Sequence, residues 1–284
     1  MGLLTNKIRE IFDYYIKSSL HVSLCVISFT FLIYIQNNIH INLTEILLVF
    51  ISTYVSYNFI KFKEVFISRS KPISDNLKSF FFTSIIFSFI LIILFFKVEI
   101  RKQIVVILVI ILTLAYSVSF FGLSRLRNYP LLKISTVSLS WSLIIVVFPF
   151  IDKLASVELL YYFISIFLIT FVEIIPFEIR DMKNDLNVVK TIVHDYGISK
   201  TKKIGYLLLI IIFLVSLFYC INYNNFKNLI SLTIVLILLG VLILKSEHNQ
   251  NKYFSPFIVE SIPIYWLIIE ILLQFFFRID NLLL

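Results

Sequence analysis

Three carboxylates at one point of the chain could bind a metal ion. Glu178, Asp181 and Asp185 lie three and four residues apart, so on a helix they share one face. Mg²⁺ prefers one or two carboxylates together with water and substrate phosphate oxygens. Spacing alone leaves two interpretations open: a site for Mg²⁺ and a diphosphate, or the solvated end of an interfacial helix. The cations that could balance further phosphate charge are Arg180, Lys183 and Lys190.

Apolar residues dominate the rest of the chain. Of its 284 residues, 60% are hydrophobic and 15% are charged, and the mean hydropathy is +0.97. Apolar runs long enough to cross a bilayer recur from end to end, which indicates a polytopic membrane protein and excludes a soluble enzyme. The net charge of +8 does not indicate nucleic-acid binding, because Lys and Arg of membrane proteins gather in cytoplasmic loops.

The apolar runs predict an all-α fold with nine transmembrane helices. Of the 25 Lys and Arg residues, 19 fall in the N-terminal tail and in alternate loops. This asymmetry places the N-terminus in the cytoplasm, and we expect a multi-pass protein of a bacterial-type inner membrane. For Arg125 and Arg127 we favour a role in setting the membrane topology over a role in diphosphate binding. The predicted spans lie near 20–38, 43–60, 79–96, 103–121, 133–151, 157–177, 204–222, 226–244 and 256–277.

The first nineteen residues have a different pattern. Apolar residues recur there at helical spacing, with charged residues on the other face, which is typical of a helix lying on the membrane surface. We therefore expect an amphipathic interfacial helix over 1–19 and a single transmembrane domain over 20–284. The apolar residues of this stripe are Ile8, Ile11, Phe12, Tyr15 and Ile16.

The acidic segment belongs to a longer pattern that runs from Pro176 to Gly197. It reads Pro-Phe-Glu-Ile-Arg-Asp-Met-Lys-Asn-Asp, followed by Lys-Thr-Ile and then the glycine. This pattern resembles the second aspartate-rich motif of the UbiA-type intramembrane prenyltransferases, although the Asp185-to-Thr191 spacing is one residue short. The stretch from Tyr129 to Lys133 resembles the Tyr/Lys signature that opens the fifth helix of that family.

The resemblance implies a nine-helix bundle with a cavity facing the cytoplasm. Members of the family move a prenyl group from an isoprenyl diphosphate to an aromatic or lipid acceptor, with Mg²⁺ stabilising the departing diphosphate. It implies catalytic roles for Asp181 and Asp185, and Mg²⁺ binding by these two residues with Glu178. The residues expected to bind the diphosphate are Asn58, Lys61, Lys133, Arg180 and Lys190.

The first aspartate-rich motif of the family is degenerate in this chain. Asn58 is present, but phenylalanine stands at 59, 62 and 66, where the family has aspartate. Two hypotheses follow: a transferase in which lysines bind phosphate directly, or a relative that has lost catalysis and binds a prenyl lipid or a partner protein. The lysines and arginine in question are Lys61, Lys63, Arg69 and Lys71.

Three glutamates lie inside predicted spans. A carboxylate in a transmembrane helix is costly, so Glu173, Glu260 and Glu270 should face the bundle interior or a wet cavity. A proton relay or acceptor positioning competes with simple packing for Glu173 and Glu270, and packing is favoured for Glu260. A transporter is a third hypothesis, which scarce glycine and the lack of an inverted repeat disfavour.

Overall fold

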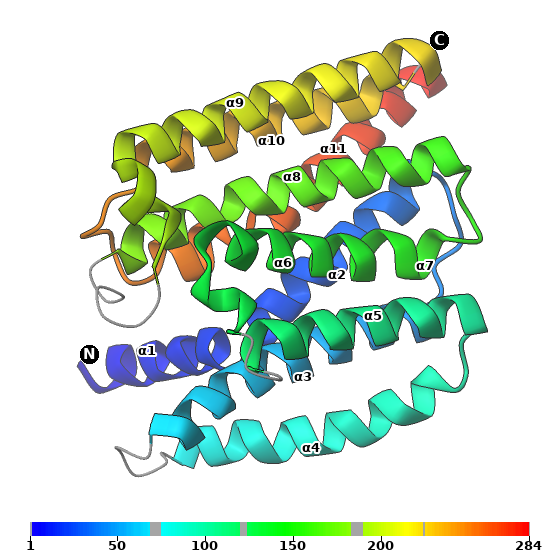
Figure 1. Cartoon of the computed structure of the whole chain (residues 1–284). Helices are drawn as coiled ribbons and strands as arrows, with labels where there is room; N and C mark the ends of the chain where they lie inside the picture. The colour runs from blue at the N-terminus through cyan, green and yellow to red at the C-terminus, as the bar shows by residue number, and fades with distance from the viewer. Residues whose placement is uncertain (1, 69–74, 120–123, 183–189, 224, 284) are drawn as a thin grey trace.

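The computed structural model describes residues 2–68, 75–119, 124–182, 190–223 and 225–283. All regular secondary structure in these ranges is helical (Figure 1). The helices are α1 (Gly2–Lys17), α2 (Leu20–Gln36), α3 (Leu43–Ser68), α4 (Asp75–Phe95), α5 (Ile100–Ser117), η1 (Leu126–Asn128), α6 (Pro130–Ser142), η2 (Leu143–Val147), α7 (Phe148–Phe150), α8 (Ser156–Asp181), α9 (Ile192–Tyr223), α10 (Phe226–Lys245), η3 (Phe254–Val259) and α11 (Ile262–Leu283).

The predicted all-α transmembrane fold is confirmed. Among the described residues, eight helices are long and apolar enough to cross a membrane, and α1 with α2 forms a ninth candidate that is bent by 58°. Two helices extend beyond the predicted spans: α3 continues to Ser68 and α9 begins at Ile192, because both run on into charged segments next to the apolar runs.

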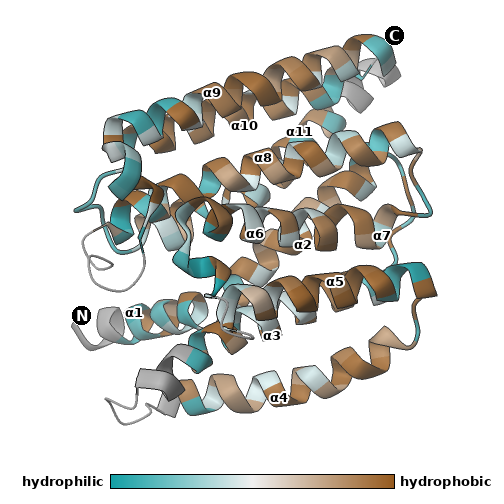
Figure 2. Ribbon diagram, viewed as in Figure 1, coloured by the Kyte–Doolittle hydropathy of each residue, from teal (hydrophilic) through white to brown (hydrophobic). Residues whose placement is uncertain are grey.

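The long helices pack side by side and run roughly along one direction (Figure 1). Contacts lead from α2 through α3, α5, α6, α8, α9, α10 and α11 back to α2, and α4 packs on α3. The two chain ends lie at opposite ends of the bundle, which we call the N-side and the C-side (Figure 1). Figure 2 shows polar residues gathered at these two sides and apolar residues between them. This distribution suits a bundle whose middle lies in hydrocarbon.

Large apolar side chains also cover the outside of the bundle. Phe82 and Phe89 of α4 and Phe96 directly after it are all exposed, and only 11% of the apolar window of this helix is buried. A soluble protein rarely exposes so much apolar surface. Helix α4 is therefore suited to contact lipid along most of its length.

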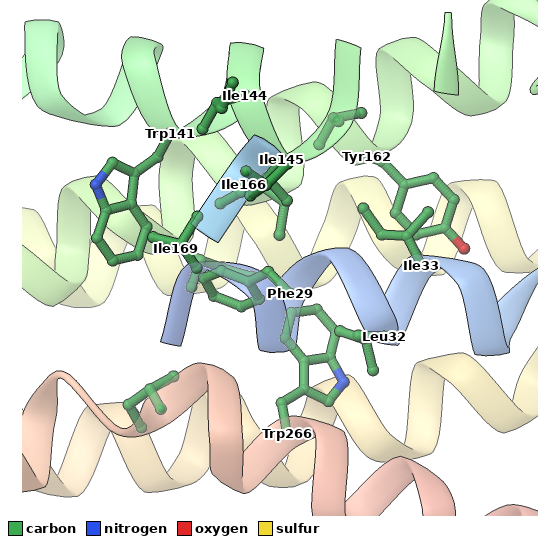
Figure 3. Close-up of a cluster of buried hydrophobic side chains, with 14 of the residues drawn as sticks. Phe29, Leu32, Ile33, Trp141, Ile144, Ile145, Tyr162, Ile166, Ile169 and Trp266 are labelled. Carbon is green, nitrogen blue, oxygen red and sulfur yellow. The ribbon is translucent and has the colours of Figure 1, made fainter. Parts of the chain in front are cut away.

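The core is centred on α2. Phe29 lies between Trp141 of α6 and Trp266 of α11, with ring centroids 6.4 and 6.0 Å away and edge-on geometry (Figure 3). Isoleucines of η2 and α8 fill the space above Phe29. The two indole N–H groups are satisfied, since Trp141 donates to the Tyr57 hydroxyl and Trp266 to Ser231. Aromatic rings with a satisfied polar end are suited to such a core.

Irregular turns interrupt several helices next to the bundle interior. Helices η2 and η3 are π-helical turns, a feature that is frequent at functional sites. Pro176 lies inside α8 and has no N–H to donate to the preceding turn. Gly197 breaks α9 with a φ of 77°, which a residue with a side chain rarely adopts. This break lets the first turn of α9 pack beneath the end of α8, where Ile192 and Val193 are buried.

Helix α1 turns sharply away from α2. Its Phe12 packs on the rings of Tyr253 and Phe257, whereas Ile8 and Ile11 are exposed. Asp13 accepts hydrogen bonds from Lys252 at 2.9 Å and from the Tyr253 hydroxyl at 2.6 Å. One face of α1 is therefore attached to the bundle and its apolar edge is uncovered. Contact of that edge with the membrane surface stays a prediction.

Candidate functional site

A cavity of about 560 Å³ lies among α3, α5, α6 and α8, and we call it the main chamber. Its walls are largely apolar, with a few hydroxyl groups from α3 and α6. A second cavity of about 210 Å³ adjoins it, and we call it the acidic lobe because four carboxyl side chains line it. The two share five lining residues, so they form one continuous site: Tyr57, Tyr116, Arg127, Val137 and Trp141.

Three cations line the main chamber near the N-side. Lys61 comes from the last part of α3, Arg127 from η1 and Arg180 from the end of α8. The Lys61 ammonium donates to the Lys17 carbonyl at 2.9 Å and to the Ser19 hydroxyl at 2.8 Å. Both acceptors are neutral, so these contacts position the ammonium without cancelling its charge. Arg127, which we had interpreted first as a topology charge, lines both parts of the site.

Lys133 and Glu178 form a buried ion pair at the wall of the acidic lobe. Their charged atoms lie 2.7 Å apart, and Glu178 also accepts a hydrogen bond from the Ile192 backbone N–H at 3.3 Å. The first residue of α6 is a proline, which is favoured in the first turn of a helix, and Lys133 follows one turn later. The pair ties α6 to α8, and the Ile192 contact ties both to the first turn of α9.

Arg180 and Asp181 pair with each other at the end of α8. The carboxylate accepts two hydrogen bonds from the guanidinium, at 2.7 and 3.2 Å. The guanidinium also lies over the Phe177 ring, 5.1 Å from its centroid. Both side chains are about 30% exposed, so this pair can open to a ligand at lower cost than a fully buried one.

Asn58 lies at the corner between α1 and α2. Its amide nitrogen donates to the Ser18 carbonyl at 3.1 Å, and its amide oxygen accepts from the Ser19 hydroxyl at 3.0 Å. Ser19 has a φ of 67°, so the Asn58 contacts stabilise a strained connection. Asn58 thus holds Ser19, whose hydroxyl accepts a hydrogen bond from the Lys61 ammonium. Its predicted contact with substrate stays a prediction.

The phenylalanines of the degenerate motif belong to another face of α3. Phe59 and Phe62 line a groove between α3 and α4, and Phe62 packs edge-on against Phe81. The residues of α3 that line the main chamber are instead Ser52, Thr53, Ser56, Tyr57, Ile60 and Lys61. Phe59 and Phe62 therefore lie on the side of α3 that faces α4, whereas the side that faces the main chamber carries a lysine and hydroxyl groups.

Comparison with solved structures found a digeranylgeranylglyceryl phosphate synthase studied in membranes, a UbiA-type prenyltransferase. The alignment covers 93% of this chain and 99% of that chain, with a TM-score of 0.61 and 16% sequence identity. The fold is that of a UbiA-type membrane bundle. No protein-family model matches the chain, and no curated protein is similar enough in sequence to match. The chain is accordingly an integral, multi-pass membrane protein.

The UbiA-type bundle brings together five of the predicted site residues. Lys133, Glu178 and Asp181 line the acidic lobe, and Arg180 lines the adjoining main chamber. Lys61 reaches the main chamber from α3. Lys190 is exposed beside the first turn of α9, and Asp185 lies outside the described residues. The residues within this site are contributed by helices far apart in the sequence, which spacing along one helix could not reveal.

The predicted magnesium site stays a prediction, because Asp185 lies outside the described residues; its other two carboxylates each have a cationic partner. Glu178 is already neutralised by Lys133 and Asp181 by Arg180. Within the described ranges, no three side chains of His, Cys, Asp or Glu are grouped as a metal site. The cations therefore dominate the chemistry that these residues can offer to an anionic ligand.

The three intramembrane glutamates have two kinds of surroundings. Glu270 accepts hydrogen bonds from Ser231 and Gln36, at 2.5 and 2.9 Å, so it belongs to a satisfied network. Glu173 and Glu260 both line the acidic lobe. We had favoured packing for Glu260; the π-turn η3, which it follows directly, places it at the cavity instead. An acid inside an apolar span was the sequence signal for both residues.

Proposed function

We propose that this protein transfers a prenyl group from an isoprenyl diphosphate to a hydrophobic acceptor within the membrane. The observation that supports the proposal best is the apolar main chamber with Lys61, Arg127 and Arg180 near one end. An amphiphile with an apolar chain and an anionic head matches a cavity that is apolar along its walls and cationic at one end. The volume of about 560 Å³ is in the usual range for small-molecule sites, roughly 300–1,000 Å³.

The arrangement suits ionisation of an allylic diphosphate. The carbon–oxygen bond breaks, and its electron pair leaves with the diphosphate. Cations fixed where that negative charge grows stabilise the transition state, and such groups are worth the most in a site that excludes water. The apolar wall of the chamber would shield the resulting carbocation from hydrolysis. Bond formation with the acceptor then completes the transfer.

Lys61 and Arg180 have separate parts in this proposal. The Lys61 ammonium is held in place by two neutral oxygens, so it would meet the diphosphate as a fixed positive charge. The Arg180 guanidinium would exchange its Asp181 contact for a bidentate contact with phosphate, a geometry for which guanidinium is well suited. The predicted Mg²⁺ requirement stays a prediction, and no step above depends on it.

The orientation in the membrane completes the proposal. The excess of Lys and Arg in the N-terminal tail and alternate loops supports a cytoplasmic position for the N-side by the positive-inside rule. The cationic end of the main chamber would then face the compartment in which soluble diphosphates occur. Cysteine accessibility at introduced N-side and C-side loop positions, in sealed and opened vesicles, would test the orientation.

A release assay tests the transferase proposal. The purified protein in lipid nanodiscs would be given isotope-labelled isoprenyl diphosphates of several chain lengths with a panel of acceptors. We expect diphosphate release and a prenylated product, both reduced by at least about tenfold in Arg180→Gln, since a hydrogen bond to a charged group is worth about 1.5–3 kcal/mol. A matched control is Arg101→Gln, which removes an exposed arginine on the C-side. Absence of release with every donor would contradict the proposal.

A non-catalytic lipid-binding relative is the second candidate. It is favoured by the chamber face of α3, which offers a lysine and hydroxyl groups but no acid among its described residues. Such a protein would retain a prenyl lipid through purification and would release no diphosphate. The same nanodisc experiment, followed by mass spectrometry of the extracted lipids, separates the two candidates.

A further inference from the structure

Three polar atoms of α8 are buried at the acidic lobe without a hydrogen-bond partner. They are both carboxyl oxygens of Glu173 and the hydroxyl oxygen of Thr170. Their side chains belong to residues that are 3% and 2% exposed. Both residues line the acidic lobe, and they lie three positions apart, so they share one face of α8. The lobe thus presents a carboxyl group and a hydroxyl group to whatever occupies it.

Other buried glutamates of the described chain are satisfied by protein partners. Glu178 is paired with Lys133, Glu45 with two lysines, and Glu270 accepts hydrogen bonds from Ser231 and Gln36. Burial of a carboxyl group without any partner is unfavourable. Glu173 therefore differs from these residues in a way that points to a ligand as the missing partner.

The position of Glu173 relates it to the proposed reaction. Tyr57, Tyr116 and Trp141 are common to the acidic lobe and the main chamber, so the two spaces meet without an intervening helix. A prenyl donor in the main chamber would have its reactive end near the cations of the N-side. A second molecule in the acidic lobe would lie beside it, which is the place that an acceptor requires.

The chemistry of the lobe limits what that acceptor can be. Glu173 and Glu260 enter it from α8 and from the end of η3. Of the cations on its wall, Lys133 is paired with Glu178, and Arg127 lies on the wall shared with the main chamber. A second negative charge placed against two carboxyl groups is disfavoured. A hydroxyl group, in contrast, donates the hydrogen bond that a carboxylate accepts, and the Thr170 hydroxyl can donate in turn to the acceptor's oxygen.

We propose that Glu173 binds the hydroxyl group of an uncharged alcohol or phenol acceptor and takes its proton during prenyl transfer. The inference rests on the proposed function. The acceptor oxygen forms a carbon–oxygen bond to the allylic carbon after the bond to diphosphate has broken. The electron pair of that bond leaves with the diphosphate, and the hydroxyl proton passes to the Glu173 carboxylate. The products are an ether and diphosphate, so atoms and charge balance.

The first test measures binding and needs no turnover. Para-hexylphenol and para-hexylbenzoate, which differ in the hydroxyl and carboxylate groups, are titrated against the full-length protein in nanodiscs. We expect the wild type to prefer the phenol by about tenfold, because the benzoate brings like charge to the lobe. Glu173→Gln should reduce this preference to about twofold. Glu270→Gln, a buried glutamate outside the lobe, should keep it.

The second test measures transfer with a labelled isoprenyl diphosphate and the phenol. Loss of a general base reduces a rate by about 100-fold or more, so Glu173→Gln should reduce ether formation by that factor while donor affinity stays unchanged. If Glu173→Gln does not fold, Thr170→Val replaces it in both tests. Thr170→Val should lower the affinity for the phenol about threefold, since one hydrogen bond is lost. The affinity for the benzoate should stay unchanged.

The outcomes separate this inference from the proposed function. An unchanged phenol preference in Glu173→Gln, or in Thr170→Val where that variant is used, overturns the inference. Ether formation unaffected by Glu173→Gln overturns the proton transfer. A third outcome is that Glu173→Gln abolishes the phenol preference but the protein never releases diphosphate. This result overturns both the transferase function and the proton transfer, and it supports the hydroxyl-binding site.

Discussion

The two ends of the bundle each contain a buried glutamate paired with lysine, yet the two clusters differ. On the C-side, Glu45 meets Lys102 at 2.9 Å and also pairs with Lys153, and Tyr34 donates to the same carboxylate. On the N-side, the pair of Lys133 and Glu178 borders a cavity that further cations line. A closed network contributes to stability alone, whereas a similar set of charges beside a cavity can bind a ligand.

Glu45 should give the largest effect on stability. Glu45→Ala leaves the ammonium groups of Lys102 and Lys153 without their shared carboxylate, and breaking a buried pair typically costs about 3–5 kcal/mol. Thermal unfolding in nanodiscs should show a strongly destabilised protein. Isoprenyl diphosphate affinity of the folded fraction should be unchanged, and a comparable loss of affinity would contradict the division between the two ends.

Substitutions in the N-side pair of Lys133 and Glu178 should separate its effect on stability from its effect on diphosphate binding. Lys133→Met leaves Glu178 buried without its cation and should destabilise the protein by roughly 3 kcal/mol. The double change to Lys133→Met with Glu178→Leu should recover most of that stability, because apolar residues replace both charges. Diphosphate binding should stay impaired in the double variant if Lys133 contacts the ligand. Full recovery of binding would show that Lys133 only supports the fold.

Arg180 offers a third comparison, with an effect on binding alone. Arg180→Gln removes a partly exposed cation of the main chamber. We expect isoprenyl diphosphate affinity to fall by about tenfold to 100-fold, as for a charged hydrogen bond, and the unfolding temperature to change little. The C-side variant Arg101→Gln should leave affinity unaltered. Equal effects of the two variants would show that affinity depends on net charge and not on the chamber.

The attachment of α1 should give the smallest effect. Hydrogen bonding with Tyr253 and with Asp13 raises the pKa of Lys252 above its usual 10.5. A raised folded pKa stabilises the folded state fully below the unfolded value and loses this contribution only as pH rises through the folded one. Protease sensitivity of α1 should therefore be constant from about pH 6 to about pH 9. Lys252→Ala should increase it at every pH, and an increase confined to acidic pH would contradict this account.

Hydropathy and charge predicted the fold well because each span must be apolar by itself. Contacts across the bundle were not predictable in the same way. Lys133 and Glu178 are separated by 44 residues, and nothing in their local sequence shows that one neutralises the other. Phe59 and Phe62 were compared with aspartates at matching positions, whereas the side of α3 that they occupy depends on how the helix is rotated. Asp185, expected to be catalytic, lies outside the described residues.

The intramembrane glutamates show the same limit. Sequence alone identified Glu173, Glu260 and Glu270 as costly and therefore informative. Their different surroundings come from neighbours on other helices: Ser231 and Gln36 satisfy Glu270, while the π-turn η3 brings Glu260 to the acidic lobe. Such neighbours are set by packing between helices, which one sequence does not display.

Photo-crosslinking tests the central claim most directly. An isoprenyl diphosphate with a photoreactive group at the end of its chain would be bound to the protein in nanodiscs, and the labelled peptides would be mapped by mass spectrometry. We expect labels on the chamber walls of α5 and η2, at Val109, Leu112 or Ile144, with labelling reduced in Arg180→Gln. Labels confined to the groove between α3 and α4, at Phe59 or Ile85, would contradict that claim.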